Sequence, residues 1–261
     1  MKILVMGDTV GRPGRKACTV LVPKICQRES IDFVVINGEN IAGGSSITAE
    51  TVKELFDAGA DVVTTGDHIF KKKEAAELVQ KNNRILRPLN YALGTPGKGS
   101  VVVEAKNGIR VAVVNLLGRV FLKPIECPFK MIEKELESLA REANVILVDM
   151  HAEATSEKVA MGWFLDGKVS AVFGTHTHVQ TADETILPHG TAYITELGMC
   201  GPYRSVIGRR TDQVLKQFLT QIPTHLEVAE EDARLSGAVI EIDPASGRAL
   251  SIKRVHEKLN E

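Results

Sequence analysis

The chain has 261 residues, of which 44% are hydrophobic and 25% are charged, and this composition is typical of a soluble globular protein. Its 32 basic and 33 acidic residues nearly balance, so the overall charge gives no indication of a nucleic-acid or membrane surface. A single α/β domain covering residues 1–261 is the simplest organisation, because no linker rich in Pro, Ser or Gly divides the sequence.

Short apolar runs alternate with helical patterns along the first two thirds of the chain. The runs at 2–7, 32–38, 60–66, 145–150 and 169–174 are rich in β-branched residues and are typical of strands buried on both faces. Helices are expected near 14–28, 48–58, 71–81, 128–142 and 155–165. This alternation predicts a sheet that is covered by helices on both sides.

The pattern changes near residue 100. Two strand-like runs flank Asn107-Gly108, a dipeptide that is typical of a hairpin turn. Further strands are expected at 191–197, 237–242 and 249–255, so the sheet is mixed, or two sheets pack as a sandwich between helices. The polar segment 205–235 is expected to be partly helical and to form a peripheral insertion outside the core.

Cysteine usage and apolar segments bear on the compartment. The four cysteines are scattered without C-x-x-C spacing, which argues against a zinc ribbon or a disulfide scaffold and fits a reducing environment. The first apolar run is too short for a signal peptide, and no stretch approaches the roughly 20 apolar residues of a membrane span. We therefore expect a cytoplasmic protein.

Side chains that can bind metal ions follow five of the expected strands. They are Asp8, Glu39, Asn40, Asp67, His68, His151, His176 and His178. Each residue alone is well explained as a turn residue, a helix cap or a structural histidine. Eight such residues at equivalent positions are not well explained by these separate roles, because binding sites in open α/β sheets lie at the carboxyl ends of the strands. The set predicts a metal site.

The residue types indicate which ions and which chemistry to expect. In extended backbone, His176 and His178 would share a face, so each could serve one metal of a pair. Oxygen and nitrogen ligands without a thiolate suit Fe, Mn or Zn better than Ca. Two such ions about 3.5–4 Å apart can clamp a phosphoryl group and generate hydroxide from water near neutral pH.

Eight motifs carry a family resemblance that extends over residues 2–256. They are GDTVGRPGR (7–15), NGENIAGG (37–44), GDH (66–68), RPLNYA (87–92), NLLGR (115–119), DMHAEATSEK (149–158), GTHTHV (174–179) and GMCGP (198–202). Together they resemble the calcineurin-like metallophosphoesterases and, more narrowly, the YmdB-like bacterial 2',3'-cyclic-nucleotide phosphodiesterases.

The resemblance implies a four-layered α-β-β-α sandwich with mixed sheets and two divalent or trivalent metal ions, iron by preference and otherwise manganese or zinc. By motif, one ion would be held by Asp8, Glu39, Asn40 and His178, and the other by Asp67, His151 and His176, with Glu39 bridging. His68 would be the general acid, since the pKa of histidine lies near neutrality. Its alternative role is to orient a ligand or to bind phosphate.

Other polar residues have weaker indications. Asn90 could bind the substrate phosphate or act as a turn residue. Glu153 could orient His151, as metal-bound histidines commonly require. Arg12 and Arg15, close in sequence to Asp8, could contact phosphate or could have solvent and helix-start roles.

The expected reaction is hydrolysis of small 2',3'-cyclic nucleotides by a metal-bridging hydroxide. The alternatives are a phosphomonoesterase or RNase-like diesterase of the same fold, and a low-activity regulatory scaffold that binds nucleotide or RNA. Near-neutral charge and 5% aromatic residues weigh against RNA binding. We expect a small phosphodiester as substrate, no membrane partner and, from the family, a homo-oligomer.

Position 67 departs from the family pattern, which is Gly-Asn-His where this chain has Gly-Asp-His. Two divalent ions with the carboxylates of Asp8, Glu39 and Asp67 leave a formal charge of +1, against +2 for an Asn. The aspartate should therefore hold metal more tightly and attract a phosphodiester less. A mixed-valence iron pair, a protonated Asp67 and reduced activity are the three open outcomes.

Overall fold

The computed structural model describes residues 1–260, and its strands form two mixed sheets. The first sheet has the order β2 (Asp8–Thr9), β11 (Met199–Pro202), β12 (Ala233–Ile242), β1 (Lys2–Met6), β3 (Phe33–Asn37) and β4 (Val62–Thr64), with β13 (Ala249–Lys258) paired to β12. The second has the order β5 (Ser100–Glu104), β6 (Arg110–Leu117), β7 (Val145–His151), β8 (Ala171–Thr175), β10 (Ala192–Ile194) and β9 (Thr185–Ile186). Each sheet contains a set of parallel strands that is flanked by antiparallel partners. The parallel sets are β1, β3 and β4 in the first sheet and β6, β7, β8 and β10 in the second.

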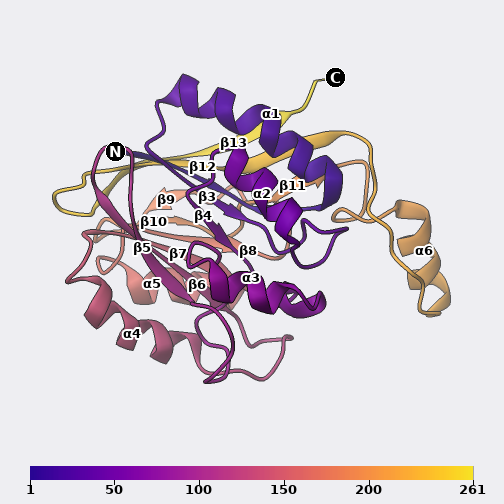
Figure 1. Cartoon of the computed structure of the whole chain (residues 1–261), viewed down its shortest axis with the longest axis horizontal. Helices are drawn as coiled ribbons and strands as arrows, with labels where there is room; N and C mark the ends of the chain where they lie inside the picture. The colour runs from indigo at the N-terminus through magenta and orange to yellow at the C-terminus, as the bar shows by residue number, and fades with distance from the viewer. Residues whose placement is uncertain (261) are drawn as a thin grey trace.

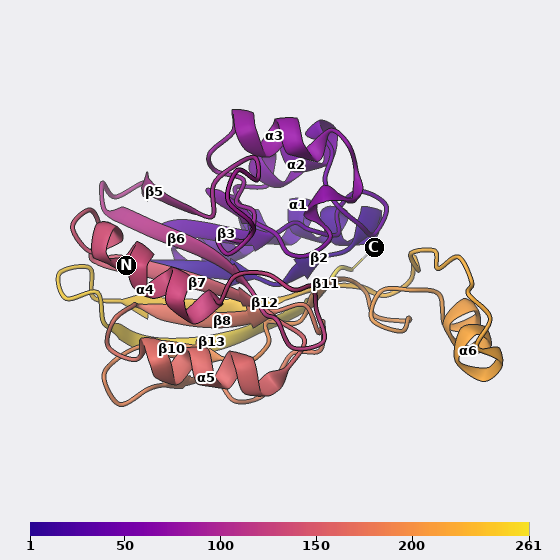
Figure 2. The same ribbon diagram turned by 90° about the horizontal axis from the view of Figure 1, so that it is seen from below.

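Helices cover the outer face of each sheet (Figures 1 and 2). Their bounds are α1 (Gly11–Glu29), α2 (Ala49–Asp57), α3 (Ala75–Lys81), α4 (Pro128–Leu139), α5 (Thr155–Leu165) and α6 (Thr211–Thr220), with a short 3₁₀ helix η1 (Ile69–Lys71) before α3. Both views place α1 and α2 on one side of the strands and α4 and α5 on the other. The expected four-layered α-β-β-α sandwich with mixed sheets is confirmed.

Side-chain alternation along the strands produces these layers. In β1, Leu4 and Met6 pack in the core beneath α1 and α2, whereas Ile3 and Val5 pack between the two sheets. The strands of the second sheet likewise divide their side chains between the inter-sheet core and the core beneath α4 and α5. Each fully buried aliphatic side chain contributes about 1.5–3 kcal/mol, which is why unbroken apolar runs form the central strands.

The hairpin at residues 100–117 forms, but with a longer turn than the sequence suggests. Strands β5 and β6 pair antiparallel, and the turn is closed by a hydrogen bond from the Gly108 N–H to the Ala105 carbonyl (2.9 Å). Gly108 has a positive φ of 80° and Asn107 does not, so these two residues are not the two central positions of a type I′ turn.

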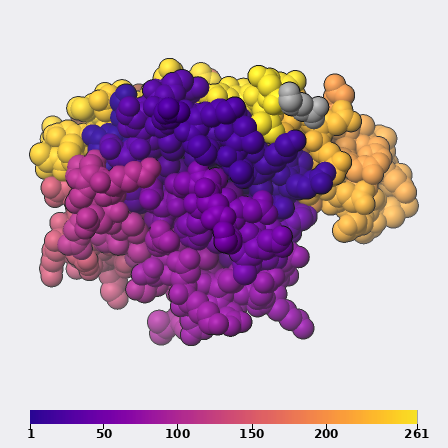
Figure 3. All heavy atoms as spheres, turned by 45° about the horizontal axis from the view of Figure 1, so that its top comes forward, coloured from indigo at the N-terminus to yellow at the C-terminus, as the bar shows by residue number. Residues whose placement is uncertain are grey.

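Residues 203–232, which we call the arm, leave the first sheet after β11 and return at β12. They carry α6, which stands away from both sheets in Figures 1 and 2 and forms the orange lobe at the right edge of Figure 3. The expected peripheral segment 205–235 includes most of the arm, although its last three residues belong to β12. Within residues 1–260, no helix has the length and apolar character that a membrane crossing needs.

Candidate metal centre

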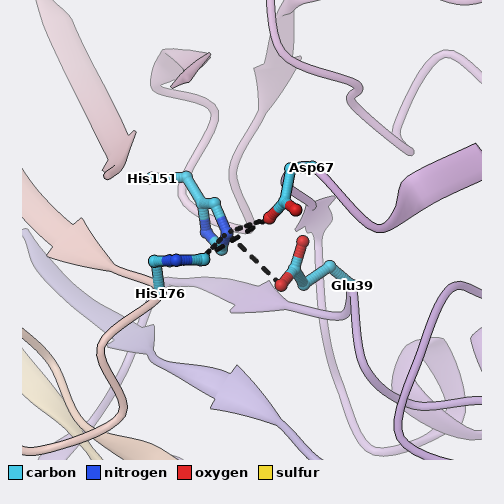
Figure 4. Close-up of side chains that lie close together, drawn as sticks. All are labelled: Glu39, Asp67, His151 and His176. Atoms are coloured by element: carbon cyan, nitrogen blue, oxygen red, sulfur yellow. Dashed lines mark hydrogen bonds and ion pairs between the residues drawn. The ribbon is translucent and has the colours of Figure 1, made fainter. Parts of the chain in front are cut away.

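The expected metal-binding side chains meet at one edge of the two sheets. Glu39 follows β3, Asp67 follows β4, His151 ends β7 and His176 follows β8. One ligand atom from each of the four lies within 4.8 Å of the others. Figure 4 shows the four side chains pointing toward one another. Because these strands are parallel within their sheets, their carboxyl ends bring together residues that are far apart in the sequence.

His151 lies at the centre of this cluster and is fully buried. Its Nε2 atom is 3.3 Å from Glu39 Oε1, 3.5 Å from Asp67 Oδ1 and 3.0 Å from His176 Nδ1 (Figure 4). Asp67 Oδ1 is buried and has no hydrogen-bond donor among the described residues. A buried carboxylate oxygen without a donor is costly, and a cation held between it and the imidazole nitrogens would remove that cost.

The partner of the other ring nitrogen sets the tautomer of His151. Its Nδ1 lies 2.8 Å from Thr175 Oγ1, and the Thr175 hydroxyl donates to Asp149 Oδ1 at 2.7 Å. Since the hydroxyl proton is committed to Asp149, Thr175 accepts from Nδ1–H, and Nε2 keeps a lone pair for a metal. Burial raises the pKa of Asp149 to about 6. Sequence reasoning missed Asp149, although it lies two residues before His151 in the motif DMHAEATSEK.

Asp8 and His178 form a second carboxylate–imidazole pair beside the first cluster. Asp8 Oδ1 is buried, has no hydrogen-bond donor within residues 1–260, and lies 3.7 Å from His178 Nε2. His178 Nδ1 lies 3.0 Å from the Ile207 carbonyl, which can only accept, so Nδ1 carries the proton and the neutral ring presents a lone pair at Nε2. The strand pairing of β2 with β11 holds Asp8 here, and these strands are too short to be predicted from periodicity.

The backbone at the two GTHTHV histidines differs from the expected extended conformation. His176 and His178 have positive φ values of 96° and 65°, so strand alternation does not place their rings. Instead the His176 N–H donates to Asp8 Oδ2 (2.8 Å), and the Thr177 N–H and hydroxyl both donate to Glu196 Oε2 (3.0 and 2.7 Å). Non-glycine residues at positive φ are rare, and clusters of them occur at functional sites.

A buried ion pair supports this strained segment. Lys158 Nζ lies 2.8 Å from Glu196 Oε2 and donates to Thr177 Oγ1 at 3.0 Å. Lys158 and Glu196 are each about 1% exposed. Lys158 ends the motif DMHAEATSEK, but no local pattern pairs it with Glu196, because the contact joins α5 to the segment after β10.

Glu153 contacts a different histidine from the one expected. Its Oε2 atom lies 3.1 Å from His176 Nε2, whereas His151 is oriented by Thr175. Glu153 therefore fixes the ring of His176, which directs its Nδ1 atom toward His151 and Asp67.

The surroundings of Asp67 favour its ionised form. Burial acts to raise the pKa of Asp67, but the neighbouring imidazoles of His151, His68 and His176 outweigh burial and hold the pKa below its usual range. The structure thus disfavours the protonated aspartate that could have mimicked the family asparagine.

The placement of Asn90 does not support the expected contact with substrate. The Asn90 side chain is completely buried. Its amide nitrogen donates to the carbonyls of Leu117 (2.7 Å) and Glu126 (2.9 Å), and its Oδ1 accepts from the Leu117 N–H (2.9 Å). Asn90 therefore ties together the backbone around residues 117 and 126, and these contacts leave its amide no free donor for a phosphate.

Gly66 lies directly against two of the side chains that could bind a metal ion. A Cβ atom at this position would overlap His151 Nε2 and Glu39 Oε2.

We expect Gly66→Ala to lose metal from the Glu39, Asp67, His151 and His176 cluster while far-UV circular dichroism stays unchanged. Gly162→Ala is the control, because its Cβ would meet the ring of Tyr193 instead of a ligand. Elemental analysis that finds full metal content in Gly66→Ala would contradict this placement.

Comparisons with known proteins agree with the motifs. The family model described as YmdB-like protein matches residues 4–255. A 2',3'-cyclic-nucleotide 2'-phosphodiesterase of Bacillus subtilis is 46% identical over 98% of this chain and 96% of its own length. Two crystal structures share the fold over 99% of this chain. One is a hypothetical protein of Thermus thermophilus (TM-score 0.93, 39% identity, 99% of that chain), and the other is a novel phosphatase of Mycoplasma pneumoniae (TM-score 0.92, 33% identity, 93% of that chain). The resemblance found in the sequence is confirmed: this chain belongs to the YmdB-like protein family.

Proposed function

We propose that this chain hydrolyses small 2',3'-cyclic nucleotides at a dinuclear metal site. Its identity of 46% to a 2',3'-cyclic-nucleotide 2'-phosphodiesterase supports the class of enzyme, a phosphodiesterase. The observation that carries the site is the pair of buried carboxylate oxygens, Asp8 Oδ1 and Asp67 Oδ1, which face imidazole nitrogens and lack donors among residues 1–260. Such oxygens are satisfied by cations.

The proposed ligand assignment is supported by the clustering of Glu39, Asp67, His151 and His176 and by the pairing of Asp8 with His178, and it takes Asn40 from the family motif. Asp67, His151 and His176 would hold one ion, Asp8, Asn40 and His178 would hold the other, and Glu39 would serve both. Oxygen and nitrogen donors of this kind suit iron, manganese or zinc. Two bound ions would polarise the phosphoryl oxygens and lower the pKa of a bound water to about 7.

The cleft above these residues favours a small substrate. Its volume is about 290 Å³, and its lining includes Asn40, His68, His176, His178 and Arg209. This volume lies at the lower end of the range for small-molecule sites. We therefore favour a mononucleotide-sized diester over an RNA chain.

His68 is held in a geometry that suits a proton donor. The Asn40 amide N–H donates a hydrogen bond to Glu39 Oε1 (3.0 Å), so Asn40 Oδ1 faces His68 Nδ1 (2.9 Å) and accepts a hydrogen bond from the Nδ1–H group. The remaining ring nitrogen, Nε2, lies 3.5 Å from Asp67 Oδ2, and one third of the side chain is exposed. In its protonated form the ring can donate its Nε2 proton to the departing ribose oxygen.

A leaving-group comparison tests this role of His68. We expect His68→Ala to lower kcat for 2',3'-cyclic AMP by about 10²–10⁴-fold, the usual contribution of general acid catalysis. Hydrolysis of bis(p-nitrophenyl) phosphate should fall far less, because p-nitrophenolate departs without a proton. Equal losses on both substrates would show that His68 binds or orients the phosphate instead.

The charge at position 67 gives a second test. We expect Asp67→Asn to hydrolyse 2',3'-cyclic AMP at least as fast as the native chain when both carry their full complement of metal, because the substitution raises the formal charge of the centre by one. It should also bind metal more weakly. Elemental analysis and turnover are measured on the same samples, and a clear fall in rate at equal metal content would refute the charge argument.

A further inference from the structure

The arm begins with a tight turn that reaches the metal centre. The Val206 and Arg209 backbones exchange two hydrogen bonds of 2.9 Å, and the two residues between them, Ile207 and Gly208, have positive φ values of 45° and 97°. Positive φ at both central positions describes a type I′ turn, in which Asn-Gly is the preferred pair. A β-branched isoleucine in this conformation is a genuine outlier, and such strain points to a functional constraint.

The strained turn brings two groups to the cleft. The Ile207 carbonyl accepts the Nδ1 proton of His178 (3.0 Å) and so fixes that ring. Arg209 lines the same cleft as His68 and His178. It is anchored by donating to the carbonyls of Gly44, in the segment after β3, and Leu226, in the returning part of the arm.

Arg209 differs from the other arginines considered for phosphate binding. Arg15 is paired with Glu54 (2.8 Å) and also donates to the Ile41 carbonyl, and Arg12 is 78% exposed and lies 3.5 Å from Glu230. Arg209 is partly buried, yet no carboxylate among residues 1–260 lies within 4.0 Å of its nitrogens. It is also the only lysine or arginine among the described residues that line the cleft.

A guanidinium carries five N–H groups, and the carbonyls of Gly44 and Leu226 engage only two of its three nitrogens. The remaining donors form part of a planar fork that matches two oxygens of a phosphate. A partly buried cation without a counter-ion is unfavourable in the free protein and becomes favourable once an anion enters the cleft.

We propose that Arg209 binds the non-bridging oxygens of the phosphate group of the substrate. This assignment rests on the proposed phosphodiesterase function. Arg209 also adds to the cleft one positive charge, which is equal and opposite to the formal charge of Asp67. The phosphodiester is thus attracted by a side chain that comes from the arm, far along the sequence from most of the metal-binding motifs.

The test uses inorganic phosphate as the probe and the metal-containing protein as purified. Arg209→Gln removes the charge and leaves a shorter side chain with an amide donor, and Arg209→Lys keeps the charge and removes the fork. Arg210→Gln is the matched control, because Arg210 is exposed and paired with Asp212 (2.9 Å) and Glu227 (3.0 Å). Metal content is measured on every sample, and phosphate binding is measured by titration calorimetry.

We expect Arg209→Gln to weaken phosphate binding by about tenfold or more, as for loss of a charge-assisted hydrogen bond, with metal content unchanged. Arg209→Lys should be intermediate, and Arg210→Gln should match the native chain. Unchanged phosphate affinity in Arg209→Gln would overturn the proposal. So would loss of metal in parallel with phosphate, because Arg209 would then support the metal centre rather than bind the anion.

The outcome also separates this inference from the proposed function. If the native chain binds phosphate in a manner that depends on Arg209 but does not hydrolyse cyclic diesters, the anion site stands and the phosphodiesterase assignment fails. If cyclic diesters are hydrolysed and Arg209→Gln leaves both KM and phosphate affinity unchanged, the enzyme stands and the role of Arg209 fails.

Discussion

The metal-binding cluster brings carboxylate oxygens and imidazole nitrogens together, and this arrangement is the constraint on which the rest of the site depends. Two of the carboxylate oxygens, Asp8 Oδ1 and Asp67 Oδ1, are buried and have no hydrogen-bond donor within residues 1–260, and Nε2 of His151 lies within 3.5 Å of two carboxylates. In the absence of cations this arrangement is unfavourable, because desolvated acceptors face each other. Bound metal ions would resolve the conflict, and metal binding would then be coupled to the free energy of folding.

Strain in the backbone is concentrated where it serves this centre. His176, His178 and Ile207 all have positive φ, and such residues cost on the order of 1–3 kcal/mol each. The buried pair of Lys158 and Glu196 holds the Thr177 backbone between the two histidines, while the Ile207 carbonyl holds His178 from the arm. A buried ion pair contributes little net stability, but it fixes one conformation. The two histidine rings are thereby directed to different carboxylates.

The sequence predicted the parts of the site that follow from periodicity and strand direction. Unbroken apolar runs identified the central strands, and because parallel strands end at one edge, the residues after them were expected to converge, as Asp67 and His151 do. Backbone strain has no sequence signal in a non-glycine residue, so the conformation of His176 was missed. Contacts across the fold, such as Glu196 with Thr177, were invisible because they join segments that no local pattern relates. The motif RPLNYA left two roles open for Asn90, and the hydrogen bonds of its side chain to the Leu117 backbone favour the structural one.

The most direct test of this account is a crystal structure of the protein as purified, with anomalous scattering recorded at the absorption edges of iron, manganese and zinc. We expect two peaks for each chain. One should lie among Asp67, His151 and His176, the other beside Asp8 and His178, and Glu39 should contact both. A single peak, or ions held by other residues while these side chains keep the positions described here, would contradict the central claim.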